Sequence, residues 1–233
     1  MNVSGIEIEV VKKDIKNMHL NVMPPSGKVR ISAPYGTSDD AINLFAVKKI
    51  GWIKKQIENF KEQERQTERD FVSGESHYVW GRRYKLEVRH SNKANNIEFK
   101  GNKMILTVRE KSTPQQRENF VYEWYRAQLK AKLPALVNKW EEIIGVHASS
   151  VEVKNMRTRW GTCNPETKKI LVNLQLAKKP VKCLEYIVIH ELIHLLEKNH
   201  TNKFIDYMDT YMHDWRVIKD ELNSFIMDSY MEE

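Results

Sequence analysis

The stretch that most constrains this 233-residue chain is IVIHELIHLLEKNH, at residues 187–200. Its apolar residues are dense enough for a helix buried in the protein, yet it also carries histidines and a glutamate. His190 and His194 lie four residues apart, which places them on one face of a helix, about 40° apart around the axis. Burying two imidazoles and a carboxylate without compensation would cost free energy. The stretch therefore predicts a buried helix whose polar residues serve chemistry.

The spacing matches H-E-x-x-H, in which two histidines bind one cation and the glutamate, here Glu191, acts as general base on water. Neutral imidazole suits zinc, and catalytic zinc sites use three protein ligands and one water. His200 is the expected third ligand, because a helix that ends at Asn199 would let the chain fold back. We expect one Zn²⁺ ion at His190, His194 and His200. Four residues remain as substitutes for the third ligand: Glu197, Asp206, Asp209 and His213.

The N-terminal part of the chain alternates apolar and polar residues, as strands with one buried face do. The segments GIEIEVV, MHLNVM and KVRISAP predict a small antiparallel meander in residues 5–33. A helix is expected to begin after Ser38 and Asp39, where apolar residues follow at helical spacing. HYVWGRRYKLEVRH, NNIEFKG and MILTVRE predict a second set of strands. The sequence shows no internal repeat.

The pattern becomes mostly helical beyond residue 112. Residues 113–145 predict a long helix or a helical pair, with Pro134 as a kink or a break. VEVKN and KKILVNLQL predict short strands around the loop RTRWGTCNPET. Strands and helices do not alternate regularly, so the expected fold class is α+β and not a doubly wound sheet. We expect a β-rich N-terminal region at 1–112 and a mostly helical catalytic region with a short sheet at 113–233.

Composition narrows the class of protein. With 41% hydrophobic and 30% charged residues, the chain has the composition of soluble globular proteins. No apolar run reaches the roughly 18 residues that cross a bilayer, and the first residues do not form a secretory signal. The two cysteines build no disulfide framework, so we expect a cytoplasmic protein with reduced thiols. The formal charge of +7 favours acidic partners and leaves nucleic acid open.

Two further segments accompany the histidine motif: RWGTC at residues 159–163 and NHTNKF at residues 199–204. With VWGRRYKLEV at residues 79–88, they resemble the YgjP-like metal-dependent hydrolases, which are related to SprT-like and wider zincin metallopeptidases. Thr162 replaces the serine of the family's R-W-G-S-C pattern. The resemblance implies that the three histidines bind zinc and that Glu191 is the catalytic acid/base. It also implies a zincin-like catalytic half.

The RWGTC loop has a structural and a functional interpretation. In the structural one, Trp160 fills the core beneath the metal helix, Gly161 permits a turn and Cys163 acts as a small apolar residue. In the functional one, Arg159 lines the substrate cleft, where its guanidinium could hold a carboxylate or a phosphate. The candidate partners for an oxyanion are Arg159, His213, Tyr207 and Tyr211.

Three functions fit these features. The first is a zinc peptidase, in which a polypeptide substrate pairs with an edge strand, for which KKILVNLQL is the candidate. The second is a metal-dependent pyrophosphatase acting on a nucleoside triphosphate, which Arg82, Arg83 and Arg159 would suit, although no glycine-rich phosphate loop is present. The third is a non-enzymatic module bound to DNA or to DNA-processing proteins. A polypeptide is the expected partner, with nucleotide or nucleic acid as alternatives and no membrane.

Overall fold

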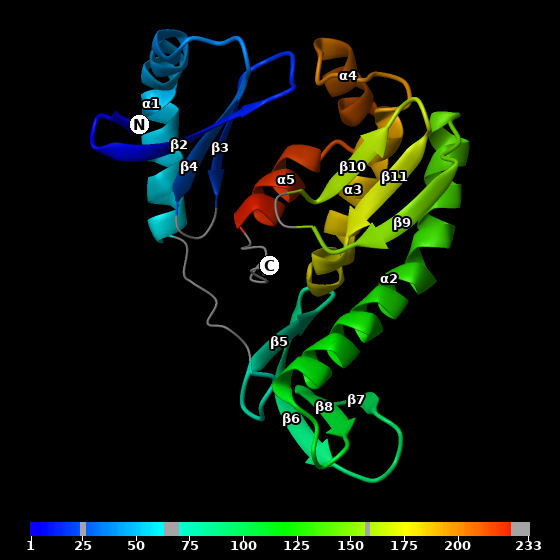
Figure 1. Cartoon of the computed structure of the whole chain (residues 1–233). Coiled ribbons are helices and arrows are strands. Elements are labelled where there is room, and N and C mark those ends of the chain that lie inside the picture. Colours follow the sequence, from blue (N-terminus) through cyan, green and yellow to red (C-terminus); the bar gives the residue numbers. More distant parts are fainter. Residues whose placement is uncertain (24–26, 63–69, 157–158, 225–233) are drawn as a thin grey trace. The chain divides into compact units, whose positions relative to one another are not determined.

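A computed structural model describes residues 1–23, 27–62, 70–156 and 159–224 of the chain (Figure 1). In these residues five helices accompany three small sheets, so the expected α+β class is confirmed. The chain divides into two compact units, Met1–Gln66 and Thr67–Glu233. The change in composition near residue 112 falls inside the second unit, between a sheet and the long helix that follows it. None of the described helices is both long and apolar enough to cross a membrane.

The first unit is a four-stranded sheet covered by one helix. Its elements are β1 (Asn2–Val3), β2 (Ile6–Lys13), β3 (His19–Met23), β4 (Lys28–Pro34) and α1 (Asp39–Glu62). The strand order is β1-β2-β4-β3, and β2 runs parallel to β4. The expected antiparallel meander is therefore wrong, because β4 carries the most buried residues and takes a central position between β2 and β3. Ile31 of β4 and Ile53 of α1 are fully buried in the core of this unit.

The second unit begins with another four-stranded sheet and a long helix. These elements are β5 (Ser76–Val79), β6 (Arg82–His90), β7 (Asn96–Lys100), β8 (Lys103–Val108) and α2 (Pro114–Ile144). The strand order is β5-β6-β8-β7. α2 runs as a single helix with Pro134 inside it, so of the two expected forms the long helix is confirmed and the helical pair is wrong. Val121, Tyr125 and Leu129 of α2 are completely buried in the core that this sheet shares with the rest of the unit.

The two sheets repeat one topology. In each, an antiparallel hairpin leads to a parallel central pair, an antiparallel strand lies at the far edge, and a long helix follows. The hairpin turns agree in conformation: Ser4 and Gly5 have φ of 52° and 81°, and Trp80 and Gly81 have φ of 50° and 81°. The repeat is one of fold and not of sequence. The chain repeats strand directions and a turn conformation, which dissimilar residues supply.

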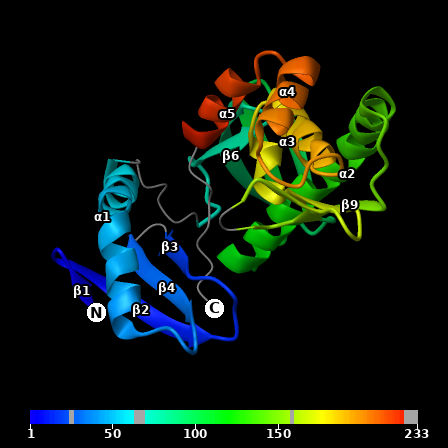
Figure 2. The ribbon, with the colours of Figure 1, turned by 90° about the horizontal axis from the view of Figure 1, so that it is seen from above.

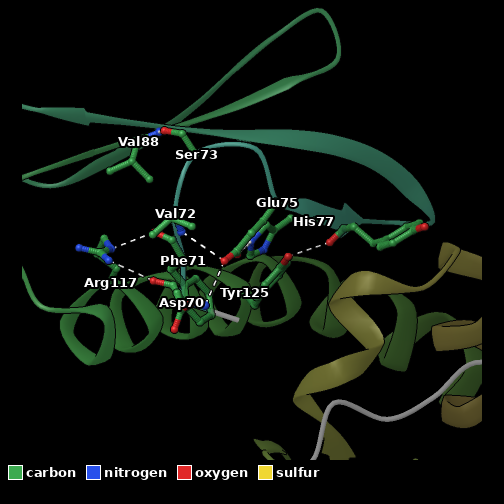
Figure 3. A network of polar contacts seen from close by, with 10 residues as sticks. Asp70, Phe71, Val72, Ser73, Glu75, His77, Val88, Arg117 and Tyr125 are labelled. Atoms are coloured by element: carbon green, nitrogen blue, oxygen red, sulfur yellow. Dashed lines mark hydrogen bonds and ion pairs between the residues drawn. The ribbon is translucent and has the colours of Figure 1, made fainter. Parts of the chain in front are cut away.

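Arg117 fixes the entry to the second sheet against α2 (Figure 3). Its guanidinium donates to the carbonyl oxygen of Phe71 at 2.9 Å and to that of Asp70 at 3.0 Å. Glu75 accepts the backbone N–H of Asp70 at 3.0 Å and contacts Nε2 of His77 at 3.1 Å. Arg117 lies in the first turn of α2, and His77 lies on β5. These contacts therefore link the segment before β5 both to the helix and to the sheet.

A three-stranded sheet and three helices complete the second unit. Its strands are β9 (Ser150–Lys154), β10 (Gly161–Asn164) and β11 (Lys169–Asn173), in the order β10-β11-β9. β11 is central, so the prediction that KKILVNLQL forms the edge strand is wrong; Ile170 and Val172 are buried, which suits a central strand better than an edge. The short helix η1 (Leu174–Lys178) leads from β11 towards α3 (Val181–Ile193).

α3 lies in the middle of the second unit and carries the histidine motif. It packs against α2, η1, β10 and β11, as well as against α4 (Asn202–Tyr211) and α5 (Trp215–Ser224) (Figures 1 and 2). Nine of its thirteen residues are buried. A helix that is covered on most of its sides can be apolar over most of its surface, which explains its sequence. The polar residues near its C-terminal end must then find partners inside the protein.

Candidate metal centre

The C-terminal end of α3 shapes the site. The helix ends at Ile193, with His194 at the cap position, and turns close immediately afterwards through Leu196 N–H to the Ile193 carbonyl at 2.8 Å. The expectation that it ends at Asn199 is wrong. Asn199 is not among the described residues with positive φ, so the chain reverses through the turns after His194 and not through a left-handed cap. This early reversal gives His200 the room to return.

The structure brings the three expected ligands together. One nitrogen from each of His190, His194 and His200 lies within 4.8 Å of the other two. The Nε2 atoms of His190 and His200 are 3.0 Å apart. Thr201 caps α4 as expected, because its Oγ1 accepts the backbone N–H of Phe204 at 3.5 Å. The cap and the early end of α3 together fix the short loop that carries His200.

The donor set fits a small divalent ion. The Nδ1 atom of His194 lies 3.1 Å from the Glu197 carbonyl oxygen, so Nδ1 donates there and Nε2 keeps its lone pair for a metal. Tetrahedral zinc holds nitrogen ligands about 3.3 Å apart, close to the spacing between His190 and His200. The buried Nδ1 of His190 has no hydrogen-bond partner among the described residues. A cation between the rings would compensate the burial of these imidazoles.

Burial keeps the three imidazoles neutral. Burial, together with the neighbouring His194 and His200, lowers the pKa of His190 to about 3. Burial is also the main reason why the pKa values of His194 and His200 lie below their ordinary value. Only the neutral imidazole offers a lone pair to a metal. The three side chains therefore stand in the metal-binding form at neutral pH.

Phe204 forms a common wall for the three imidazoles. Its ring centroid lies 4.9 Å from that of His190, 4.8 Å from that of His194 and 4.7 Å from that of His200. The side chain is 2% exposed and comes from the first turn of α4. Sequence reasoning did not assign it a role, although the segment NHTNKF contains it at a fixed distance from His200. Phe204 restricts the orientation of all three rings at once.

Glu191 is buried beside the imidazoles, at 4% exposure. Burial raises the pKa of its carboxyl group to about 8, and the positive charge of Arg159 opposes this rise. Arg159 is exposed on the segment before β10, and its carbonyl oxygen accepts a hydrogen bond of 2.7 Å from Nδ2 of Asn173. The structure thus brings Arg159 within electrostatic reach of Glu191.

The other residues of the RWGTC loop take distinct places. Trp160 is 9% exposed and belongs to the core of the second unit, as expected. Gly161 does not form a turn, and this prediction is wrong: it begins β10 and lies against Glu191. Cys163 is half-buried, and burial together with the charge of Glu191 raises the pKa of its thiol to about 11. A thiol with this pKa is protonated at neutral pH and is a poor nucleophile.

The alternative third ligands are engaged elsewhere or lie outside the histidine group. Asp209 accepts a hydrogen bond of 2.8 Å from Trp215 Nε1 and pairs with Arg216. Among the described residues, the group whose atoms could hold an ion around His190 contains histidines alone. Sequence reasoning did not single out Tyr186, which lies on α3 one turn before His190 with ring centroids 5.8 Å apart. Burial raises its pKa to about 12.

Comparison with known proteins finds a family that covers most of the chain. A family model described as YgjP-like, metallopeptidase domain, matches residues 16–225. No curated protein matches the sequence. Similar solved structures include the metallopeptidase zymogen of Pyrococcus abyssi abylysin, with 18% identity and a TM-score of 0.36 over 38% of this chain and 90% of that one. For the metallopeptidase zymogen of Methanocaldococcus jannaschii jannalysin the identity is 25% and the TM-score 0.35, over 39% of this chain and 92% of that one.

Proposed function

Since the chain belongs to the YgjP-like family of metallopeptidase domains, we propose that it is a zinc-dependent peptidase. His190, His194 and His200 hold the ion in this proposal, and Glu191 is the general base. The observation that carries it is the convergence of three neutral imidazoles, with ligand atoms within 4.8 Å of one another, next to a buried carboxyl group. Imidazole nitrogens in this number are the usual protein ligands of catalytic zinc.

Each side chain has one task in the reaction. The bound ion supplies Lewis acidity, which polarises the scissile carbonyl and makes water acidic enough to attack near neutral pH. Glu191 takes the proton of the attacking water on a carboxylate oxygen and passes it to the nitrogen of the leaving amine. A carboxyl group whose burial raises its pKa can both take up and release a proton near neutral pH. Arg159 opposes that rise and so favours the carboxylate form.

The edge strand β10 offers a place for an extended polypeptide. One side of β10 pairs with β11, and among the described strands none pairs with its other side. An extended chain can add to such an edge through backbone hydrogen bonds, whatever its side chains are. Gly161 at the start of β10 lies directly against Glu191. A peptide on this edge would therefore pass beside the general base, which supports a polypeptide substrate.

The nucleotide and DNA alternatives gain no support of this kind. Arg82 donates to the carbonyl oxygen of Gly101 at 3.2 Å, and its guanidinium lies 5.1 Å from the ring centre of Tyr84. These contacts engage it within the sheet of β5–β8. Hydrolysis of a nucleoside triphosphate and binding to DNA stay predictions, and the experiment below tests the first of them.

The purified protein should be loaded with one equivalent of zinc and incubated with unfolded casein and, separately, with nucleoside triphosphates. We expect casein cleavage that a chelator stops and that re-added zinc restores. Glu191→Gln should retain zinc by elemental analysis and lose turnover, because an amide cannot accept the proton. A Glu191→Gln variant as active as the parent would show that Glu191 is not the general base. Cleavage of nucleotides without cleavage of casein would show that the protein is a nucleotide hydrolase and not a peptidase.

A further inference from the structure

Gly161 leaves no space for a side chain. A β-carbon at this position would lie 2.5 Å from Oε1 of Glu191, 2.9 Å from its Cγ and 2.8 Å from Cγ2 of Ile187. All three distances are far shorter than ordinary van der Waals contact. The carboxylate of Glu191 thus occupies the place that a side chain on this face of β10 would take.

The strand cannot retreat from α3, because the segment before it is fastened. Asn173 is fully buried, and its Nδ2 donates to the carbonyl oxygens of Met156 at 2.8 Å and Arg159 at 2.7 Å. Its backbone N–H donates to the Trp160 carbonyl at 2.9 Å. Gly161 itself pairs with Val172 of β11. One asparagine therefore holds the backbone that enters β10 at a fixed distance from the metal helix.

The requirement for glycine comes from contact and not from backbone conformation. Gly161 is not among the residues with positive φ, so an alanine could adopt the same backbone without strain. Relief of the contact must come from the neighbouring side chains. Ile187 is 5% exposed, and its Cγ2 is attached directly to the β-carbon, so it can move little. The carboxylate of Glu191 ends a longer side chain and is the group that would swing away.

We propose that Gly161 is a positioning residue: its missing side chain lets the carboxylate of Glu191 pack directly against the edge strand β10. This rests on the proposed function for the role of Glu191, while the packing itself does not. A β-carbon at 161 would push the carboxylate from the line along which it meets water and the leaving amine. None of the three histidines is among the atoms nearest to the added β-carbon, so their arrangement should persist. Gly161 thus couples the substrate-binding edge to the general base.

The packing is tested by a double-mutant cycle on the metal-free protein, which needs no activity. Gly161→Ala should lower the melting temperature by several degrees when Glu191 is present. In a Glu191→Ala background, which removes Cγ and the carboxylate and leaves the contact with Ile187, the same change should cost less. Should Gly161→Ala alone fail to fold, recovery of folding in the double variant is the same result. Equal losses in both backgrounds would overturn the proposal.

The positioning role is tested by kinetics on the zinc-loaded protein. Gly161→Ala should bind zinc as the parent does and show a kcat about 100-fold lower with a KM within about twofold, as displacement by an ångström costs. Gly51→Ala on α1, where an added β-carbon meets no atom within 4 Å, is the matched control and should leave kcat and KM unchanged.

The two tests separate the two proposals. If the stability coupling is present and kcat does not fall in Gly161→Ala, the packing is correct and Glu191 is not the base. If the coupling is missing, Gly161 does not position Glu191, whatever the activity of Glu191→Gln.

Discussion

The Nε2 atoms of His190 and His200 lie 3.0 Å apart, although one belongs to the buried helix α3 and the other to the loop before α4. Two neutral imidazoles that point nitrogen at nitrogen can share one proton or one cation. Burial lowers the pKa of both rings, so a shared proton is held weakly at neutral pH. A divalent ion satisfies both lone pairs and that of His194 together. The metal binding that we propose would account for the loop geometry.

Replacing His200 with alanine removes one of the three proposed ligands. Zinc affinity should fall by more than about 100-fold, because even outer-shell changes at metal sites cost up to that factor. In the parent protein, free zinc at about 100 times its dissociation constant should raise the free energy of unfolding by about 2.7 kcal/mol, and in His200→Ala the gain should vanish. Thermal melts with and without zinc measure this.

The matched control is His213→Ala, which removes an exposed histidine outside the group of three. It should gain the same stability from zinc as the parent. A His200→Ala variant that is stabilised as strongly as His213→Ala would remove His200 from the ligand set.

Glu191 should make the metal-free protein less stable as pH rises. Burial raises its pKa to about 8 in the folded protein, above the ordinary carboxyl value of 4.5. A group whose pKa is raised on folding contributes stability below its unfolded pKa, and this contribution is lost as pH rises through the folded pKa. Glutamine does not ionise and has no such dependence. The melting temperature of Glu191→Gln should therefore gain on that of the parent between about pH 5 and pH 8.

The histidines change the stability with pH in the opposite direction. They do not affect the comparison between Glu191→Gln and the parent. Their folded pKa values are lowered, so their contribution is lost as pH falls below the unfolded value of 6.5. Both proteins carry the same histidines, and the difference between the two melting curves isolates Glu191. The measurement is a series of melts in a chelator. A difference that stays constant across the range would show that Glu191 is not buried as a neutral acid.

Local spacing explains which parts of the site could be predicted from the sequence. His190, Glu191 and His194 share one helix, where four residues are about one turn, and Thr201 caps the helix that follows it directly. These relations span a few residues, so the sequence alone determines them. The α+β class follows in the same way from the period of the apolar residues in each segment.

The parts that could not be predicted depend on residues far apart in the chain. Phe204 contacts three rings only because α3 ends early, and Gly161 meets Glu191 across thirty residues. The central position of β11 depends on which strands it pairs with, and a strand of β-branched residues suits an edge and a centre alike in its sequence. The repeated sheet topology is a matter of strand direction, which alternating apolar residues do not encode.

Phe204→Leu should weaken metal binding more than it weakens the fold. Leucine keeps the position apolar but removes the ring face that touches all three imidazoles at 4.7–4.9 Å between centroids. We expect zinc affinity to fall by about tenfold, as for other residues that orient metal ligands. Competition with a chromogenic chelator measures it. Phe99→Leu, a change at an exposed ring on β7, is the control, and equal zinc affinities in the two variants would contradict the role of Phe204.

Asn173→Ala should loosen the segment that leads into β10. The change leaves the carbonyl oxygens of Met156 and Arg159 without their donor, and the asparagine is fully buried. Unsatisfied buried groups of this kind should lower the free energy of unfolding by about 3 kcal/mol. Denaturant titration measures this, with the exposed Asn96→Ala as control. A loss no larger than that of Asn96→Ala would mean that Asn173 does not fasten the segment.

The two units should unfold separately. Each has its own cluster of buried side chains, and the buried residues of the first unit contain none of the proposed zinc ligands. A unit of this size has a small core and a low stability. We expect two thermal transitions, of which zinc raises only that of the second unit. Ile31→Ala should lower the transition temperature of the first unit, because it removes about 2–5 kcal/mol from the core of that unit. A single transition that both zinc and Ile31→Ala shift would show that the two units unfold as one.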